Sequence, residues 1–172
     1  MYAADGSMAE YDKSIRMHLL AEIFKTYSSR CFRANAMDFD DLLLNTNILF
    51  RDFPDVLAAS QDRLSYILVD EYQDTNYAQY LIVKKLAAIH HNLCVVGDDA
   101  QSIYSFRGAR IENILEFRND YADYRLFKLE QNYRSTQTIV NAANAIIANN
   151  TGQIHKKVFS KNEPVEKIMV MQ

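Results

Sequence analysis

The sequence predicts an α/β fold in which helices flank a parallel sheet and the N-terminal part is rich in helix. Two apolar runs, residues 66–69 and 93–96, have the composition of short, fully buried strands of a parallel sheet. Residues 76–90, which lie between them, repeat apolar side chains with a helical period. A strand, a helix and a second strand within about thirty residues form a right-handed βαβ unit, the usual element of such sheets.

Length and composition set the class of protein. The chain has 172 residues, of which 49% are hydrophobic, enough for one domain or for one domain and part of a second. The net charge of −3 argues against a free-standing nucleic-acid binder, but it leaves room for a local basic groove. Cys31 and Cys94 have no Cys or His nearby in metal-ligand spacing, so we expect free thiols in a reducing compartment. Since no apolar run reaches the roughly 18 residues that span a bilayer, we expect a cytoplasmic protein with no membrane partner.

Three helices are expected before the first strand. Residues 8–33 are expected to form the first helix, with a stripe of apolar side chains that should face the core. Asp38 is predicted to cap the second, and Asp40 and Asp41 fall in its first turn, where the helix dipole favours acids over the alternative of a metal site. Pro54 opens a third helix that reaches about residue 60. The stripe of the first helix consists of Tyr11, Ile15, Leu19, Ile23 and Tyr27.

Two carboxylates, Asp70 and Glu71, end the first strand. They should lie at the carboxyl edge of the sheet, where open α/β sheets bind ligands. One carboxylate there can hold a hard cation through oxygen, and the other can orient or deprotonate a water. The pair fits the acidic half of a phosphate-hydrolysing site, although ordinary strand ends also carry Asp-Glu.

The second strand also ends in acids, in a turn at residues 97–99, and Gln101 follows at the same edge of the sheet. Tyr104, Phe106 and Arg107 then alternate aromatic and cationic groups in a loop. This combination suits stacking on exposed bases and contact with phosphates. The alternative is that both aromatic rings pack underneath the loop.

The remaining elements follow in order. Residues 111–117 are predicted to form a short helix, and residues 125–129 a third strand. Ser135 or Thr136 should cap a further helix that carries Ile139, Val140, Ala143, Ile146 and Ile147 on one face. After it, residues 153–164, with Lys156, Lys157 and Lys161, are predicted to be a solvated loop, and residues 168–171 a final strand.

Three stretches together resemble the superfamily-one DNA helicases of the UvrD/Rep/PcrA type. ILVDEYQDTN is similar to helicase motif II, VVGDDAQSIYSFRGA to motif III, and LEQNYRST to motif IV. In this order these motifs are very specific, and they imply a partial RecA-like sheet of the P-loop NTPase class. Two positions depart from the family pattern: Phe106 stands where Trp is usual, and Arg110 stands where an acid or Asn is common.

The resemblance implies ATP and Mg²⁺ as ligands and assigns roles to residues. Asp70 matches the acid that holds Mg²⁺, and Glu71 matches the general base. Gln101 matches the sensor of the γ-phosphate, Arg134 the arginine finger, and Tyr133 the ring that stacks on adenine. The loop that grips single-stranded DNA is matched by Tyr104, Phe106 and Arg107.

No GxxxxGK[ST] loop occurs in the sequence, so the phosphate cradle of the family is missing. We therefore expect an internal fragment: residues 1–36 as the helical end of the 1B subdomain, 37–129 as the C-terminal half of RecA-like domain 1A, and 130–172 as the start of domain 2A. The fragment alone should be inactive. Its parent should be an ATP-driven 3′-to-5′ helicase that acts on single-stranded and duplex DNA in repair or replication.

Two alternative functions remain, and the absence of the phosphate cradle has one consequence for the sheet. The first alternative is a degenerate, non-hydrolysing DNA- or protein-interaction module, which need not keep Glu71 and Arg134. The second is a metal-dependent nuclease using Asp70, Glu71 and Asp74, which leaves Gln101 unexplained. In the RecA-like strand order that the resemblance implies, the strand before the absent phosphate cradle would lie between the strands at residues 93–96 and 125–129. The consequence of its absence is an open sheet edge. Residues 125–129 could close it, or residues 168–171 or a second copy could fill it, and we expect self-association.

Overall fold

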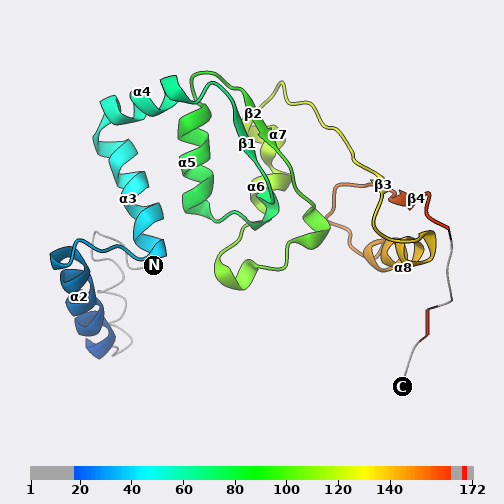
Figure 1. Ribbon diagram of the computed structural model, residues 1–172, viewed down its shortest axis with the longest axis horizontal. Coiled ribbons are helices and arrows are strands. Elements are labelled where there is room, and N and C mark those ends of the chain that lie inside the picture. Colours follow the sequence, from blue (N-terminus) through cyan, green and yellow to red (C-terminus); the bar gives the residue numbers. More distant parts are fainter. Residues whose placement is uncertain (1–17, 164–167, 170–172) are drawn as a thin grey trace. The chain divides into compact units, whose positions relative to one another are not determined.

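The computed structural model describes residues 18–163 and 168–169. These residues form two compact units. The described residues before Tyr66 make the first together with Leu81–His90, and Tyr66–Tyr80 makes the second with the described residues from His91 onward. Helices and parallel strand pairs are both present, which confirms the α/β class (Figure 1). The predicted domain boundaries after residues 36 and 129 stay a prediction.

The first unit is helical. Asp38 caps the second helix of this unit as predicted: its Oδ1 accepts from the Asp41 backbone N–H at 2.8 Å, and the Asp41 carboxylate accepts from the Asp38 N–H in return. Gln61 is buried, and its Nε2 is satisfied by donating to the Lys85 carbonyl at 2.7 Å. The helices are α2 (His18–Arg33), α3 (Phe39–Asp52), α4 (Pro54–Arg63) and, from Leu81 on, α5 (Tyr77–Ala87).

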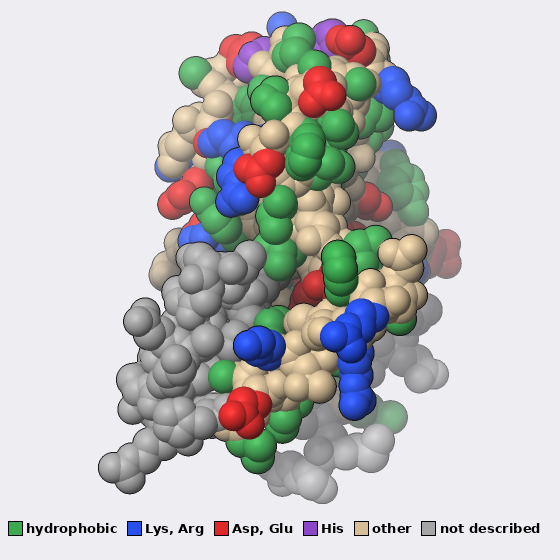
Figure 2. Space-filling model, turned by 90° about the vertical axis from the view of Figure 1, so that its left-hand side faces the viewer, with side chains coloured by type: hydrophobic (Ala, Val, Ile, Leu, Met, Phe, Trp, Pro, Cys, Tyr) green, Lys and Arg blue, Asp and Glu red, His purple; other side chains and the backbone are tan. Residues whose placement is uncertain are grey.

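The predicted core-facing stripe of the first helix is wrong for the residues that the structure describes. Leu19, Ile23 and Tyr27 on α2 are exposed, and the earlier stripe positions lie outside the described residues. No described element of this unit covers that face of α2, which leaves the stripe open to solvent. Figure 2, which looks at the molecule from the left-hand side of Figure 1, shows hydrophobic side chains at the surface, interspersed with acidic and basic ones.

The second unit contains the predicted βαβ strands. Strand β1 (Ile67–Val69) pairs in parallel with β2 (Leu93–Val95), with Val69 opposite Val95. Past the ladder, the Val96 N–H donates to the Val69 carbonyl at 2.8 Å. The expectation of fully buried strands is wrong, because Leu68 is exposed: in the described residues this sheet has two strands and one uncovered face.

Short helices follow the two strands and carry the core of this unit. Tyr72 is almost fully buried, and its ring meets Phe117 edge-on at 6.1 Å. Buried Asn113 donates from Nδ2 to both the carbonyl and the hydroxyl of Thr75, each at 3.0 Å. These contacts anchor the loop after β1. The elements are η1 (Tyr72–Asp74), η2 (Asp99–Gln101), η3 (Ser105–Arg107), α6 (Glu112–Leu115) and α7 (Phe117–Asp120).

The predicted third strand at residues 125–129 is wrong. This segment, yellow in Figure 1, belongs to no helix or strand, and Leu126, Phe127 and Leu129 are exposed. The reason is physical: a strand needs a neighbouring backbone in register, and within the described chain β2 pairs only with β1. The idea that this segment closes up beside β2 is therefore also wrong.

A second parallel pair lies near the C-terminus. Strand β3 (Gln131–Asn132) pairs with β4 (Phe159–Ser160), and α8 (Gln137–Ile147) connects them. Thr136 is the N-cap residue of α8, but its side chain makes no capping hydrogen bond. The predicted apolar face is split, because Val140 is buried whereas Ile139, Ala143 and Ile146 are exposed. Of the predicted final strand, Ile168 and Met169 are not in a strand, and residues 170–171 lie outside the described residues.

In the part of the chain that the structure describes, no helix combines the length and the apolar character needed to cross a membrane.

Candidate functional site

The carboxyl edge of the β1–β2 pair gathers the predicted acidic residues. Because the strands are parallel, both lead their following loops to this edge. Asp70 is exposed, and its Oδ1 accepts from the Glu71 backbone N–H at 2.9 Å. Glu71 is exposed too and adopts a left-handed backbone conformation with φ of 51°. The chain thus turns sharply at Glu71 instead of continuing as a strand.

Gln73 joins the two loops at this edge and was missed from the sequence. Its side chain is fully buried, with 1% of the residue exposed. Its Nε2 donates to Glu71 Oε2 at 2.8 Å, and its Oε1 accepts from the Asp98 backbone N–H at 3.0 Å. One buried amide therefore fixes the Glu71 carboxylate to the start of the loop after β2. Apolar periodicity carries no signal for such a residue.

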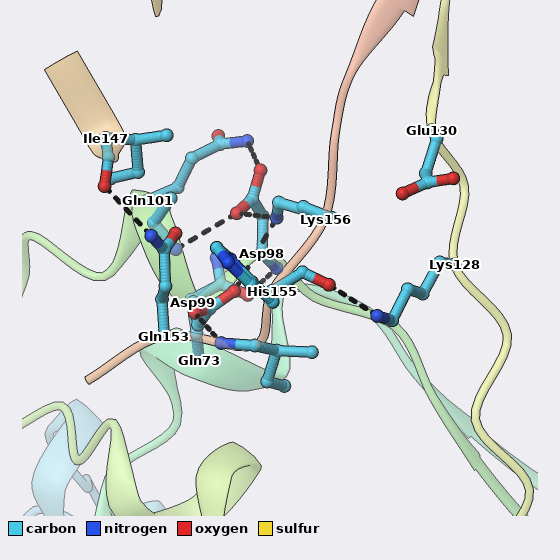
Figure 3. Close-up of polar contacts among 12 residues, drawn as sticks. Gln73, Asp98, Asp99, Gln101, Lys128, Glu130, Ile147, Gln153, His155 and Lys156 are labelled. Atoms are coloured by element: carbon cyan, nitrogen blue, oxygen red, sulfur yellow. Dashed lines mark hydrogen bonds and ion pairs between the residues drawn. The ribbon is translucent and has the colours of Figure 1, made fainter. Parts of the chain in front are cut away.

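Gln101 and Asp98 lie together after β2. Gln101 Nε2 donates to Asp98 Oδ2 at 2.9 Å, and Lys156 forms an ion pair with Asp98 Oδ1 (Figure 3). Partial burial raises the pKa of the Asp98 carboxyl, but the hydrogen bonds from Lys156 and Gln101 outweigh it, so the pKa lies below its usual value. Asp98 is therefore a carboxylate at neutral pH.

The prediction of a solvated loop at residues 153–164 is wrong for its first part. Lys156 also lies 3.6 Å from Asp99, and the Ile154 backbone N–H donates to Asp99 Oδ2 at 2.8 Å. Asp99 is buried, and a buried carboxylate needs donors and a cation. Two adjacent acids after an apolar strand were the one signal that such a cation exists, but the sequence does not say which lysine supplies it.

The aromatic loop is exposed. Phe106 is 76% exposed, Tyr104 is 40% exposed, and their ring centroids are 5.9 Å apart. The Arg107 guanidinium lies over both rings, at 5.6 and 5.5 Å from their centroids. The alternative that both rings pack underneath is wrong. The loop offers two apolar plates and a cation, which is what stacking on unpaired bases requires.

Arg110, which departs from the family pattern, has a local role. Its guanidinium lies 5.4 Å from the centroid of the Tyr77 ring, its Nε is 3.8 Å from Glu112, and its backbone N–H donates to Thr75. The cation–π contact accounts for a cation at this position.

Tyr133 and Arg134 lie between β3 and α8, and both are exposed. Asn132 Oδ1 shapes this turn by accepting from the backbone N–H groups of Arg134 and Ser135, at 2.9 and 2.7 Å. No hydrogen bond or ion pair between described residues joins the Arg134 side chain to Glu71 or Gln101. The structure therefore brings Glu71 and Gln101 to one edge of the β1–β2 pair, whereas Arg134 follows β3, a strand of the other described sheet.

Metal sites made of protein side chains alone are absent among the described residues. No group of three or more His, Cys, Asp or Glu side chains is placed to hold an ion there, and Cys31 and Cys94 are free.

Two family models match the chain. The UvrD/REP helicase N-terminal domain matches residues 3–122, and the UvrD-like helicase C-terminal domain matches residues 127–172. The chain is similar to ATP-dependent DNA helicase PcrA from Staphylococcus aureus, with 51% identity over 150 residues, which are 87% of this chain and 20% of that protein. Helicases of the same name from Leuconostoc citreum and Staphylococcus epidermidis are 50% and 49% identical over 83% and 87% of the chain. The chain spans about a fifth of the length of the curated relatives it matches.

Proposed function

This chain belongs to the UvrD/REP helicase family, and from that membership we propose that it is a segment of an ATP-dependent DNA helicase. The proposed parent couples ATP hydrolysis to 3′-to-5′ movement on single-stranded DNA, opens duplex DNA, and serves repair or replication in the cytoplasm. Residues 1–36, 37–129 and 130–172 would be parts of subdomain 1B and of RecA-like domains 1A and 2A.

The observation that carries this proposal is the link between Glu71 and the loop after β2. Buried Gln73 bonds to both, so the carboxylate that would activate water and the segment that ends in Gln101 form one hydrogen-bonded unit. A general base must be held in a fixed direction to take a proton from an attacking water. In the proposed site, Glu71 is that base and Gln101 senses the γ-phosphate.

Asp70 fits the Mg²⁺ that the family implies. Its Oδ1 is engaged by the Glu71 N–H, which leaves Oδ2 to face a cation at the exposed edge. Mg²⁺ in nucleotide sites takes one or two carboxylates, and phosphates and waters complete its shell, so a single protein carboxylate suffices. When bound, the ion neutralises charge on the phosphates.

DNA would contact the loop formed by Tyr104, Phe106 and Arg107. This loop begins three positions after Gln101, so the nucleotide sensor and the stacking rings share one short stretch of chain. Their exposure and the Arg107 guanidinium over both rings support base stacking and phosphate contact. A shift of Gln101 on ATP binding would move this loop directly.

The test uses the full-length protein that carries this segment. Glu71→Gln should abolish ATP turnover and preserve nucleotide binding, because the amide keeps the shape but cannot take a proton. Arg134→Ala should lower kcat, as expected for an arginine finger, and Tyr133→Ala should mainly raise KM for ATP. Glu116→Gln, at an exposed acid directly after α6 to which the proposed site assigns no role, is the matched control and should change nothing.

Steady-state ATPase assays with and without single-stranded DNA, together with calorimetric nucleotide binding, measure these effects. Turnover that survives Glu71→Gln would contradict the assignment of the base. A wild-type protein that binds DNA but hydrolyses no ATP would support the alternative, a non-hydrolysing interaction module.

A further inference from the structure

A line of polar contacts connects Gln101 to a lysine far along the chain. Lys156 pairs with Asp98 Oδ1, and the other oxygen of Asp98 accepts from Gln101 Nε2 at 2.9 Å (Figure 3). Lys156 falls within the match to the helicase C-terminal domain, whereas Asp98 and Gln101 fall within the match to the N-terminal domain. The contact therefore joins the two parts of the chain that the family models separate.

The Lys156 side chain is largely buried and contacts two carboxylates. Its side chain is only 19% exposed, and it lies 3.6 Å from the Asp99 carboxylate, whose side chain is 3% exposed. The Ile154 backbone N–H bonds to the same carboxylate at 2.8 Å, which fixes the approach of this segment. A cation that neutralises a buried carboxylate is held far more firmly than one in a surface ion pair.

Asp98 uses its two oxygens for different purposes. Oδ1 accepts from Lys156 and from the Ala100 backbone N–H, the latter at 3.0 Å. With that oxygen held by two donors, the plane of the carboxylate is set and Oδ2 points in one direction. Gln101 Nε2 bonds to this oxygen, so the orientation of the Gln101 amide depends on Lys156.

We propose that Lys156 is a positioning residue for Gln101, acting through Asp98. The inference rests on the proposed function, in which Gln101 senses the γ-phosphate. Gln101 has one amide nitrogen for two acceptors, the Asp98 carboxylate and a phosphate. Lys156 defines the resting position from which the amide moves, and it carries any movement of Asp98 to the chain that follows α8. Without Lys156 the Asp98 Oδ1 keeps only the Ala100 N–H, so the direction of the carboxylate, and with it that of the Gln101 amide, is less well defined.

The experiment measures DNA-stimulated ATP hydrolysis by the full-length protein. Lys156→Met should lower kcat by at least about ten-fold, the usual scale for removing a residue that orients a reacting group. KM for ATP should stay within about two-fold, because the proposed adenine and metal contacts are elsewhere. Lys156→Arg should restore most of the rate. Lys157→Met, at the exposed neighbouring lysine, should leave the rate unchanged.

The decisive comparison is made in a Gln101→Ala background. If Lys156 acts through Gln101, adding Lys156→Met to Gln101→Ala should cause no further loss. A further loss equal to that seen in the wild type, or a Lys156→Met protein with wild-type kcat, would overturn the proposal. A wild-type protein without DNA-stimulated hydrolysis would instead overturn the proposed function.

A second measurement does not depend on activity. In the 172-residue chain, the NMR signals of the Gln101 side-chain amide should shift on Lys156→Met and stay in place on Lys157→Met. Unchanged Gln101 signals in Lys156→Met would show that no positioning occurs, whatever the ATPase assay reports.

Discussion

Gly97 lies directly after β2, where any side chain would meet the buried amide of Gln73. A methyl group at this position would lie 2.5 Å from Gln73 Oε1 and 2.8 Å from Ile114 Cδ1. Gln73 cannot swing away freely, because it is buried and its amide is bonded at both ends, to the Asp98 N–H and to Glu71. Gly97→Ala should therefore break the link between the two loops.

The expected free-energy change combines three contributions. Overpacking in a filled interior costs about 1–3 kcal/mol, and losing the hydrogen bond to the Asp98 N–H costs about 1 kcal/mol more. Replacing glycine by alanine restricts the unfolded chain, which returns about 0.4–1 kcal/mol. Gly97→Ala should thus destabilise the chain by about 1–3.6 kcal/mol. Gly152→Ala is the matched control, because its methyl would have only Asn150 Oδ1 near it, at 4.0 Å.

Urea unfolding followed by circular dichroism compares the two variants. Gly97→Ala should unfold at a lower urea concentration than the wild type, and Gly152→Ala at the same or a slightly higher one. Adding Gln73→Ala to Gly97→Ala should cost less than the sum of the two single changes, because the clash with Gln73 is then removed and only the one with Ile114 Cδ1 remains. A Gly97→Ala protein as stable as Gly152→Ala would refute the reasoning.

Four further outcomes are expected. Asn113→Ala, which removes two buried hydrogen bonds, should lower the free energy of unfolding in urea by about 2–3 kcal/mol. Asn119→Ala, at the exposed asparagine of α7, should lower it by almost nothing. Hydrogen bonding with Cys31 and Asp38 raises the pKa of Tyr27 to about 12, so its contribution to stability is complete below the ordinary value of about 10 and is lost as pH rises through 12; in a spectrophotometric titration, Tyr27→Phe should remove one tyrosine step near pH 12. Phe106→Ala should weaken single-strand binding by the full-length protein by roughly 1–3 kcal/mol, and Phe127→Ala, at an equally exposed ring outside the loop, should not; equal losses would argue against stacking. Light scattering of the chain should show a mass that rises with concentration, since β2 has an open edge within the described residues; a constant monomer mass would exclude self-association.

Local patterns predicted the parts of the fold that local interactions determine. The Asp38 cap forms because the acid and the Asp41 backbone N–H that it satisfies are three residues apart in the chain. The strands at residues 66–69 and 93–96 were predicted because apolar runs are intrinsic to the sequence. The acids and Gln101 after these strands were expected at one sheet edge, and the parallel pairing of β1 and β2 leads both loops there.

The errors concern interactions between distant residues. Residues 125–129 have the composition of a strand, but a strand exists only where another backbone accepts its hydrogen bonds, and composition does not show the neighbour. Lys156 looks like any lysine in a polar loop, and its partner Asp98 is 58 residues away. The role of Gln73 could not be predicted for the same reason, because it depends on two hydrogen bonds to different loops. Roles carried over from the family, including those of Arg134 and Tyr133, stay predictions.

The left-handed conformation of Glu71 has an evolutionary consequence. A residue with a Cβ at φ of 51° is strained by about 1 kcal/mol or more relative to glycine, which adopts this conformation freely. Glycine at position 71 would relieve this strain, but it would also take the Glu71 carboxylate away from the buried Nε2 of Gln73, at a comparable cost in free energy. Glu71→Gly should therefore change stability little and abolish ATP turnover by the proposed helicase, and loss of this acid is the first change to expect in a lineage whose motor is no longer under selection.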